Sequence, residues 1–298
     1  MRQFISRNKR WLGYISYCII LAIGFLYCRF PSDALRDYLQ ARASNFNTPL
    51  FLSIERVRPW PPFGLRLGQA QVSLQHKPAR KVFGAESLLI SPEPWSFFRG
   101  QGKYRFECLA YGGNLSGYIH FRKSSTSGPF DAEIELKGIR IGTYGYLKDL
   151  IGRKVDGILS GTVYYSGEQT DLMGGNGEAS LRLLDGRVEL LLPILSLQSI
   201  DFNDVKMDMV LKKQEISLTR LELEGPQMKS TLSGTVSLKE DFAKSTLDLK
   251  GSLEPFASLF KDAGGLQNTL RLFKRGLRRG TLAFVIYGTI GEPKIKFT

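Results

Sequence analysis

The chain has 298 residues, of which 41 are basic, 28 are acidic and 31 are glycine. Four basic residues precede the first apolar segment, which leaves 37 basic against 28 acidic residues, a net charge of +9. These charges are scattered along the chain rather than gathered among aromatic residues, which argues against nucleic-acid binding. The many glycines favour short strands and tight turns, and the length suits one large β domain.

The first structural expectation is a membrane anchor at residues 11–28, which contain no charged residue. As a helix they would span about 27 Å, just enough for a hydrocarbon core. A cleaved signal peptide shares this pattern, but bulky residues follow the small residues at 22–24, so we favour an uncleaved anchor. The anchor would be formed by Trp11, Tyr14, Ile19, Leu21, Phe25 and Leu26.

The basic residues at 1–10 predict the orientation of this anchor. By the positive-inside rule they form a cytoplasmic tail, so the bulk of the chain lies across a bacterial inner membrane, in the periplasm. Residues 29–46 read as a juxtamembrane amphipathic helix capped near Ser32, and residues 47–298 read as the periplasmic β domain. Cys108 is the one cysteine of that exported part, so no internal disulfide is expected there.

Two shorter segments also read as helices. Residues 144–151 predict a short helix between strands, and residues 255–275 predict a second helical insert. The second ends in a basic run that could contact anionic phospholipid or simply be a solvated face and a favourable helix end. The candidate anionic-lipid contacts are Arg271, Lys274, Arg275, Arg278 and Arg279.

Three further stretches carry local expectations. The apolar stretch 190–197 is too short to cross a membrane, so it is a buried strand or a short core helix. Residues 172–178 contain three glycines and read as a loop. Residues 111–114 read as the turn of a hairpin.

The stretch from Val205 to Leu253 shows the strand pattern most clearly. Apolar residues alternate with polar ones, as expected for half-buried strands. The alternation changes phase near Thr219–Arg220, which predicts a bulge or a strand break. The sequence therefore predicts a mainly β fold: one N-terminal transmembrane helix, then a curled antiparallel meander sheet with two or three short helical inserts.

A five-residue pattern recurs within these strands, with glycine at its centre and an apolar residue at each end. Its five copies are centred on Gly117, Gly161, Gly234, Gly251 and Gly288. A glycine on the apolar face of a strand permits a sharp bend or the close approach of another chain. We interpret these glycines as curvature points, with direct ligand contact as the alternative.

Reactive chemistry finds little support in the sequence. The chain has two histidines, His76 and His120, and neither has the spacing of a metal site. No Gly-x-Ser-x-Gly nucleophile elbow is present, and the glycine pairs lack the lysine of a phosphate loop. We therefore expect no enzymatic activity, no cofactor and no metal.

The order of several motifs resembles a known family, the inner-membrane protein N of the type II secretion pathway (GspN), in its roughly 300-residue form. The motifs are the basic start with a single anchor, the proline-rich turn before Gly64–Leu65, Tyr111–Gly117, Gly157–Gly161 and Gly288–Pro293. The β region is also similar to the AsmA family, whose long curled sheets have a greasy inner face implicated in handling phospholipids. Neither resemblance implies catalytic residues.

Two functions follow as expectations. The first is a non-enzymatic inner-membrane component of the type II secretion system, whose β domain binds other secretion proteins or itself. The second is an AsmA-like protein that binds or moves phospholipid, although about 250 β residues would need oligomers or a partner to bridge a periplasm. Its candidate apolar groove consists of Leu115, Leu159, Val163, Leu232, Val236, Leu247, Leu249 and Ile286.

Overall fold

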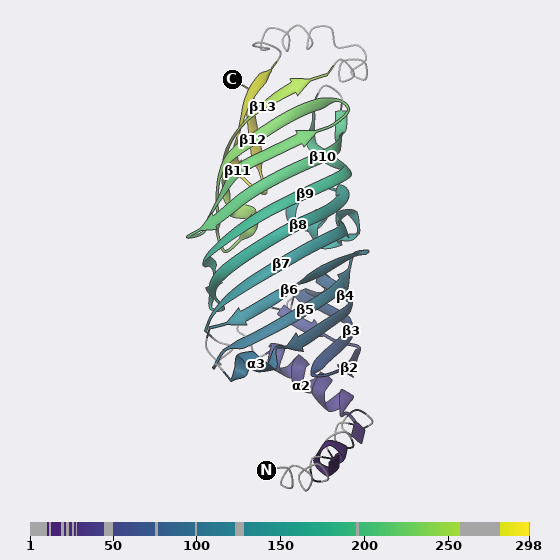
Figure 1. Ribbon diagram of the computed structural model, residues 1–298. Coiled ribbons are helices and arrows are strands. Elements are labelled where there is room, and N and C mark those ends of the chain that lie inside the picture. Colours follow the sequence, from purple (N-terminus) through teal and green to yellow (C-terminus); the bar gives the residue numbers. More distant parts are fainter. Residues whose placement is uncertain are drawn as a thin grey trace.

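The computed structural model describes residues 11, 13–18, 21, 24–25, 27, 29–44, 50–74, 77–98, 100–122, 128–194, 197–256 and 281–297. They form one antiparallel sheet of 15 strands (Figure 1). From β3 to β15 each strand pairs with the next one in sequence, while β1 and β2 both pair with β3. The mainly β meander that the sequence predicts is confirmed.

The strands lengthen toward the middle of the sheet. Their bounds are β1 Leu50–Ser53, β2 Arg56–Trp60, β3 Gly64–Leu74, β4 Lys77–Pro92, β5 Gly102–Ala110, β6 Gly113–Phe121, β7 Pro129–Arg140, β8 Val155–Glu168, β9 Asp171–Ile194, β10 Leu197–Lys212, β11 Glu215–Glu224, β12 Met228–Ser237, β13 Thr246–Pro255, β14 Leu282–Thr289 and β15 Pro293–Phe297. The helical elements are short: α2 Ser32–Ser44, α3 Pro94–Phe97, η1 Ile141–Thr143, α4 Gly145–Ile151 and η2 Phe242–Lys244.

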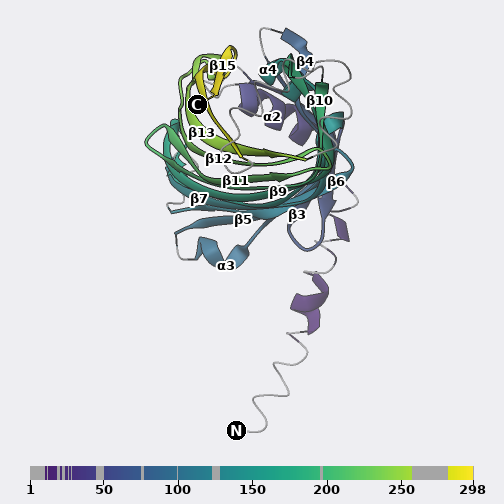
Figure 2. The ribbon, with the colours of Figure 1, turned by 90° about the horizontal axis from the view of Figure 1, so that it is seen from above.

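The sheet curls strongly about its long axis. Figure 2, which looks along that axis, shows the strands bending into a U with α2 inside the curve and α3 outside it. Helix α2 packs Leu35 and Leu39 against a buried cluster that includes Ile54, Val57 and Leu67. Because α2 lies inside the curve, the face carrying these apolar residues is the concave face of the sheet.

The strand pattern near Val205–Leu253 agrees with the structure in detail. Strands β10 to β13 form consecutive antiparallel pairs. The register shifts where Thr219 interrupts β11, and its hydroxyl donates a hydrogen bond of 2.9 Å to the carbonyl of Asp208. The bulge predicted at Thr219–Arg220 is therefore confirmed. It keeps apolar residues on one face on both sides of the break.

The glycine-rich residues 172–178 form the start of β9, so the predicted loop is wrong. Tyr165 on the neighbouring strand explains the glycines, because its ring lies where a side chain on Gly175 would have to be. The Tyr165 hydroxyl also donates a hydrogen bond of 2.8 Å to the carbonyl of Leu172. The glycines here provide space for an aromatic ring rather than a turn.

The other short segments have mixed outcomes. The 144–151 helix is confirmed as α4 and the 111–114 turn as the β5–β6 hairpin. The 190–197 stretch is strand up to Ile194, and β10 begins at Leu197. Of the predicted helical insert at 255–275, all but residues 255–256 lies outside the described residues, as do the five basic residues at its end.

At the N-terminus the helix predicted at residues 29–46 is present as α2, Ser32–Ser44, and its position next to a membrane stays a prediction. No helix in the described part of the chain combines the length and the apolar character that a membrane crossing requires. Ile19 and Leu26 lie outside the described residues, whereas Trp11, Tyr14, Leu21 and Phe25 are helical and exposed. The membrane anchor therefore stays a prediction.

Candidate functional site: an apolar concave face

The register of the sheet aligns apolar residues into continuous rows on the concave face. Residues that lie directly opposite one another on neighbouring strands point to the same side of the sheet, because side chains alternate in direction along each strand. One such row runs from β5 to β15 and consists of Phe106, Gly117, Ile134, Val163, Ala179, Met209, Leu218, Gly234, Leu249, Ile286 and Ile295.

Parallel rows lie on both sides of it. One contains Leu115, Leu136, Leu181, Met207, Leu221 and Leu232, and another contains Ile119, Ala132, Leu211, Ile216, Val236 and Leu247. We call these rows together the apolar face. It extends across the sheet without a charged residue in any of the three rows.

The apolar face is only partly covered by the described residues. The main cluster of fully buried apolar side chains lies near α2, around Ile54, Ala70 and Ala85. Farther along the sheet a few positions such as Leu249 are buried, whereas most of the rows are half-buried. A large apolar surface of this kind is typical of an interaction or ligand-binding site.

Seven of the eight residues of the predicted groove lie in the rows of the apolar face. The eighth, Leu159, pairs with Ile139 and Leu183 in the next row on the same side of the sheet. Alternation alone could identify this set, because a period of two places these residues on one side of each strand. Whether they bind a ligand stays a prediction.

The repeated glycines lie where the backbone of a neighbouring strand occupies the space that a β-carbon would need. A β-carbon built on Gly117 would collide with the carbonyl oxygen of Glu133, and one on Gly234 would collide with that of Asp248. Gly161 and Gly234 also adopt φ angles of +149° and +138°, which L side chains rarely adopt. These contacts favour the interpretation of the glycines as curvature points.

Aromatic side chains, which the sequence reasoning missed, line both rims of the apolar face. On one rim Tyr104, Phe121, Phe130 and Tyr165 follow one another with ring centroids 5.5 to 6.1 Å apart. They come from successive strands at the same strand ends, as the pairing of Phe121 with Phe130 shows. The sequence signal for these rims is an aromatic residue near the end of several strands. This signal is not specific, because turns and buried cores also contain aromatic residues at such positions.

The opposite rim carries a second aromatic series, formed by Phe83, Tyr111, Tyr144 and Tyr146. Burial raises the pKa values of Tyr111 and Tyr144, so both phenols stay protonated well above neutral pH. Helix α4, which begins directly after Tyr144, contacts both β4 and η2, elements far apart in sequence. The helix therefore lies close to both a strand of the sheet and the connection between β12 and β13.

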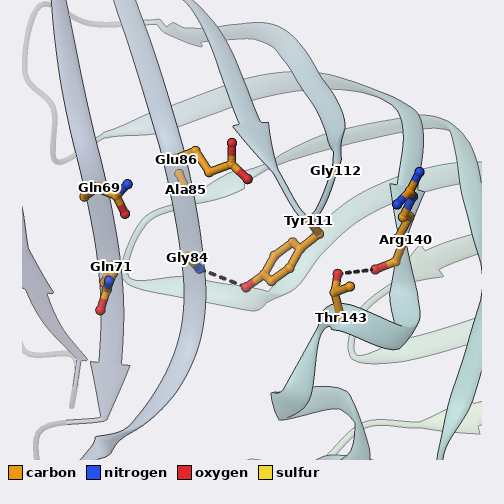
Figure 3. A pocket seen from close by; sticks show the side chains of 9 residues that line it. All are labelled: Gln69, Gln71, Gly84, Ala85, Glu86, Tyr111, Gly112, Arg140 and Thr143. Carbon is orange, nitrogen blue, oxygen red and sulfur yellow. Dashed lines mark hydrogen bonds between the residues drawn. The ribbon is translucent and has the colours of Figure 1, made fainter.

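A pocket of about 330 Å³ lies beside this rim (Figure 3). It forms where β4 runs past the end of β5, because β5 ends at Ala110 and pairs only with the Ser87–Pro92 part of β4. The Tyr111 hydroxyl contacts the part of β4 beyond this pairing by accepting a 2.8 Å hydrogen bond from the Gly84 backbone N–H. The pocket is lined by Gln69, Gln71, Gly84, Ala85, Glu86, Tyr111, Gly112, Arg140 and Thr143.

The outer face of the sheet has the opposite character, with charged side chains that form ion pairs between and along the strands. Arg182 donates to Asp204 at 2.8 Å, Arg122 donates to both oxygens of Asp131, and Arg220 pairs with Glu222 at 2.6 Å. Such exposed pairs add little stability each. They do mark this side as the solvated face.

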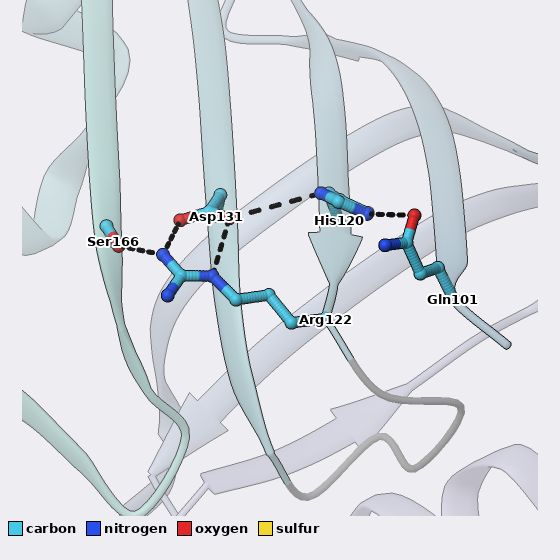
Figure 4. Close-up of polar contacts among 5 residues, drawn as sticks. All are labelled: Gln101, His120, Arg122, Asp131 and Ser166. Atoms are coloured by element: carbon cyan, nitrogen blue, oxygen red, sulfur yellow. Dashed lines mark hydrogen bonds and ion pairs between the residues drawn. The ribbon is translucent and has the colours of Figure 1, made fainter. Parts of the chain in front are cut away.

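One outer-face cluster contains a serine, a histidine and an aspartate (Figure 4). Its geometry does not suit a hydrolase, because Ser166 accepts a 2.9 Å hydrogen bond from Arg122 rather than facing the imidazole. His120 instead places Nε2 3.2 Å from the Gln101 amide oxygen and Nδ1 3.9 Å from Asp131. Among the hydrogen bonds of the described residues none joins Ser166 to the His120 imidazole, as a serine nucleophile with a histidine base would require.

Another candidate reactive group is Cys108, which lies on the concave side and belongs to the same buried cluster as Ala110. Burial raises the pKa of its thiol to about 11, so the nucleophilic thiolate is scarce at neutral pH. No group of three or more potential metal-ligating side chains occurs within the described ranges. His76 lies outside those ranges.

Comparisons of the chain with protein-family models, with curated proteins and with solved structures give no match.

Proposed function

We propose that the apolar face binds the acyl chains of phospholipid, and that the protein acts by binding rather than by catalysis. The observation that carries this proposal is the row of apolar residues and glycines from β5 to β15, most of which are half-buried. Strands lie about 4.8 Å apart, so an acyl chain crossing them would meet a new apolar side chain at each strand. Because the sheet is curved, it would partly surround the acyl chain and so increase the area of contact between the acyl chain and the apolar face.

The expected energetics favour such a ligand. Each buried methylene contributes about 0.8 kcal/mol, so roughly ten buried methylenes would contribute about 8 kcal/mol before ordering costs. The aromatic rims add phenol groups at the edges of the face, and tyrosine suits a boundary between an apolar and a polar region. A phospholipid has this division between its chains and its headgroup.

The cellular setting belongs to the same proposal. Segment 11–28 would hold the protein in a bacterial inner membrane by a single pass, with residues 1–10 in the cytoplasm and the sheet in the periplasm. Membrane phospholipid would then lie within reach of the sheet. Nucleic acid is not a proposed partner, because the outer-face arginines named above are paired with carboxylates.

A second candidate is a role as a component of the type II secretion system. It is favoured by the open sheet, whose last strand β15 pairs only with β14 among the described strands. An edge strand can bind a strand of another protein through its main chain. The partner would be another secretion protein or a second copy of this chain.

Crosslinking from paired positions tests acyl-chain binding in the full chain. A photoreactive residue is placed at Val163 or Leu247 on the apolar face, and at the adjacent outer-face positions Thr162 or Asp248 as matched controls. We expect covalent phospholipid adducts, detected by mass spectrometry, at Val163 and Leu247 only. Absence of adducts at both inner positions, or equal yields on both faces, would contradict the proposal.

A deletion strain separates the two candidates. Retention of normally secreted proteins in the periplasm with an intact outer membrane would support the secretion role. Normal secretion with a leaky outer membrane would favour lipid handling. A normal phenotype in both assays, together with no lipid adducts, would count against both.

A further inference from the structure

Four large aromatic side chains are exposed at the end of the sheet where α2 lies. The exposed fractions are 39% for Trp60, 64% for Phe63, 76% for Trp95 and 83% for Phe98. Trp60 and Phe63 belong to the β2–β3 hairpin, whereas the other two belong to α3 and the residue after it. Leu65 pairs with Ile90, so the hairpin turn and the β4–β5 connection lie at the same strand ends.

The α3 segment holds its rings outward by polar contacts that do not involve them. The Ser96 hydroxyl donates to the Glu93 carbonyl at 2.7 Å and accepts from the Lys103 N–H at 3.1 Å. Lys103 also forms a 3.3 Å ion pair with Glu93. The connection between β4 and β5 is thus held by these polar contacts. The ring centroids of Trp95 and Phe98 lie 6.0 Å apart, and most of the surface of both side chains is exposed.

Next to these rings two arginines face each other without a carboxylate. Arg58 on β2 lies directly opposite Arg66 on β3, and the Arg66 guanidinium lies 4.1 Å from the centre of the Trp60 ring. In the described part of the chain neither arginine has an acidic partner within 4.0 Å, and nearby Glu55 pairs with Arg56. Like charges directly opposite one another destabilise a sheet, so this arrangement suits an external anion.

We propose that this end of the sheet is a membrane-contact surface that binds the headgroup region of a bilayer containing anionic phospholipid. Its residues are Arg58, Trp60, Phe63, Arg66, Trp95 and Phe98. Tryptophan and phenylalanine enter the interfacial region readily, and arginine binds phosphate in a bidentate manner. This inference does not depend on lipid binding by the apolar face.

The position of the surface supports a membrane over a protein partner. Figure 1 shows α2 and α3 at the same end of the sheet, and α2 is the element through which the N-terminal segment joins the sheet. Figure 2 places α3 on the outer side of the curve, away from the concave face. A bilayer that holds residues 11–28 would therefore lie near these rings.

Tryptophan fluorescence provides a direct test, because the chain has three tryptophans. The full-length Trp11→Phe variant retains Trp60 and Trp95 and is mixed with phosphatidylcholine vesicles containing about one third phosphatidylglycerol, with brominated acyl chains. We expect the bromines to quench both tryptophans, and high salt to weaken the quenching. As a matched control, Tyr287→Trp in a background without the native tryptophans places the probe on the outer face of β14, where we expect no quenching.

Charge reversal tests the arginines. We expect the double variant Arg58→Glu and Arg66→Glu to lower tryptophan quenching by anionic vesicles at least several-fold. The control is the double variant Lys294→Glu and Lys296→Glu, which makes an equal charge change on β15 and should leave the quenching unchanged. The proposal is overturned if Trp60 and Trp95 stay unquenched while the protein sediments with the vesicles, or if the Tyr287→Trp probe is quenched equally. A concentration-dependent burial of Trp95 without lipid would identify a protein interface instead and also overturn it.

Discussion

The phenolic oxygen of Tyr111 lies 2.8 Å from the backbone nitrogen of Gly84, in the part of β4 that runs past the end of β5. This contact joins the β5–β6 turn to a part of β4 that β5 does not pair with. The same ring packs edge-on against Phe83 and lies 5.1 Å from Tyr144. One side chain thus connects β4, the β5–β6 hairpin and the segment leading into α4.

The first prediction concerns this contact. We expect Tyr111→Phe to lower the free energy of unfolding by about 1 kcal/mol, because the Gly84 N–H loses its side-chain acceptor in a partly buried position. Urea denaturation of the full chain measures the change. Tyr287→Phe, which alters an exposed tyrosine on β14, is the control and should be neutral. Equal effects of the two substitutions would show that the Tyr111 hydrogen bond adds nothing.

The repeated glycines give a second prediction. We expect Gly234→Ala to destabilise the sheet by roughly 3 kcal/mol, because the new methyl group meets the Asp248 carbonyl and the φ angle of +138° is strained for alanine. Gly68→Ala is the control, since the nearest atom to its β-carbon would be Arg56 Cβ at an ordinary 3.6 Å. Urea midpoints compare the two. If Gly234→Ala left the urea midpoint unchanged, sheet curvature would no longer explain why glycine recurs at these positions.

Acid sensitivity gives a third prediction, through Asp131. The hydrogen bonds from Arg122 hold the pKa of this carboxyl below its usual value. A depressed folded-state pKa contributes stability above the unfolded-state pKa, near 4, and this contribution is lost as pH falls through the folded-state value. We therefore expect Asp131→Asn to cost at most about 1 kcal/mol at pH 7, since the pair is partly exposed, and to cost less at pH 3.

Urea midpoints at the two pH values measure this difference. Asp248→Asn, on the outer face and without an ion pair in the described part of the chain, is the control. A penalty for Asp131→Asn that is as large at pH 3 as at pH 7 would contradict the role of the ion pair.

The fourth prediction concerns Cys108. In a full-length variant with Cys18→Ser and Cys28→Ser, Cys108 is the one remaining thiol. With a pKa of about 11 rather than 9.0, its thiolate fraction at pH 8 falls roughly a hundredfold, so we expect at least that slowing of its reaction with a disulfide reagent. Urea should restore the normal rate. Rapid reaction of the folded protein would show that the concave side opens near Ala110.

Much of the fold follows from alternation in the sequence. The strands from Val205 to Leu253, the bulge at Thr219 and the set of apolar residues on one face are all predictable, because a period of two directly places side chains on the two sides of a strand. The curl was also predictable from the repeated glycines. Each of these features depends on residues close together in the chain.

Contacts between distant segments decided the rest. The glycines at 174–177 read as a loop until Tyr165 is seen to occupy the space above Gly175. The aromatic rims bring together strand ends from separate hairpins, and Arg58 faces Arg66 only because of the β2–β3 register. Trp95 and Phe98 are brought to the same strand ends as Trp60 only by the way in which β3, β4 and β5 pair. Period and composition do not specify such pairings, because they arise only when the whole sheet is assembled.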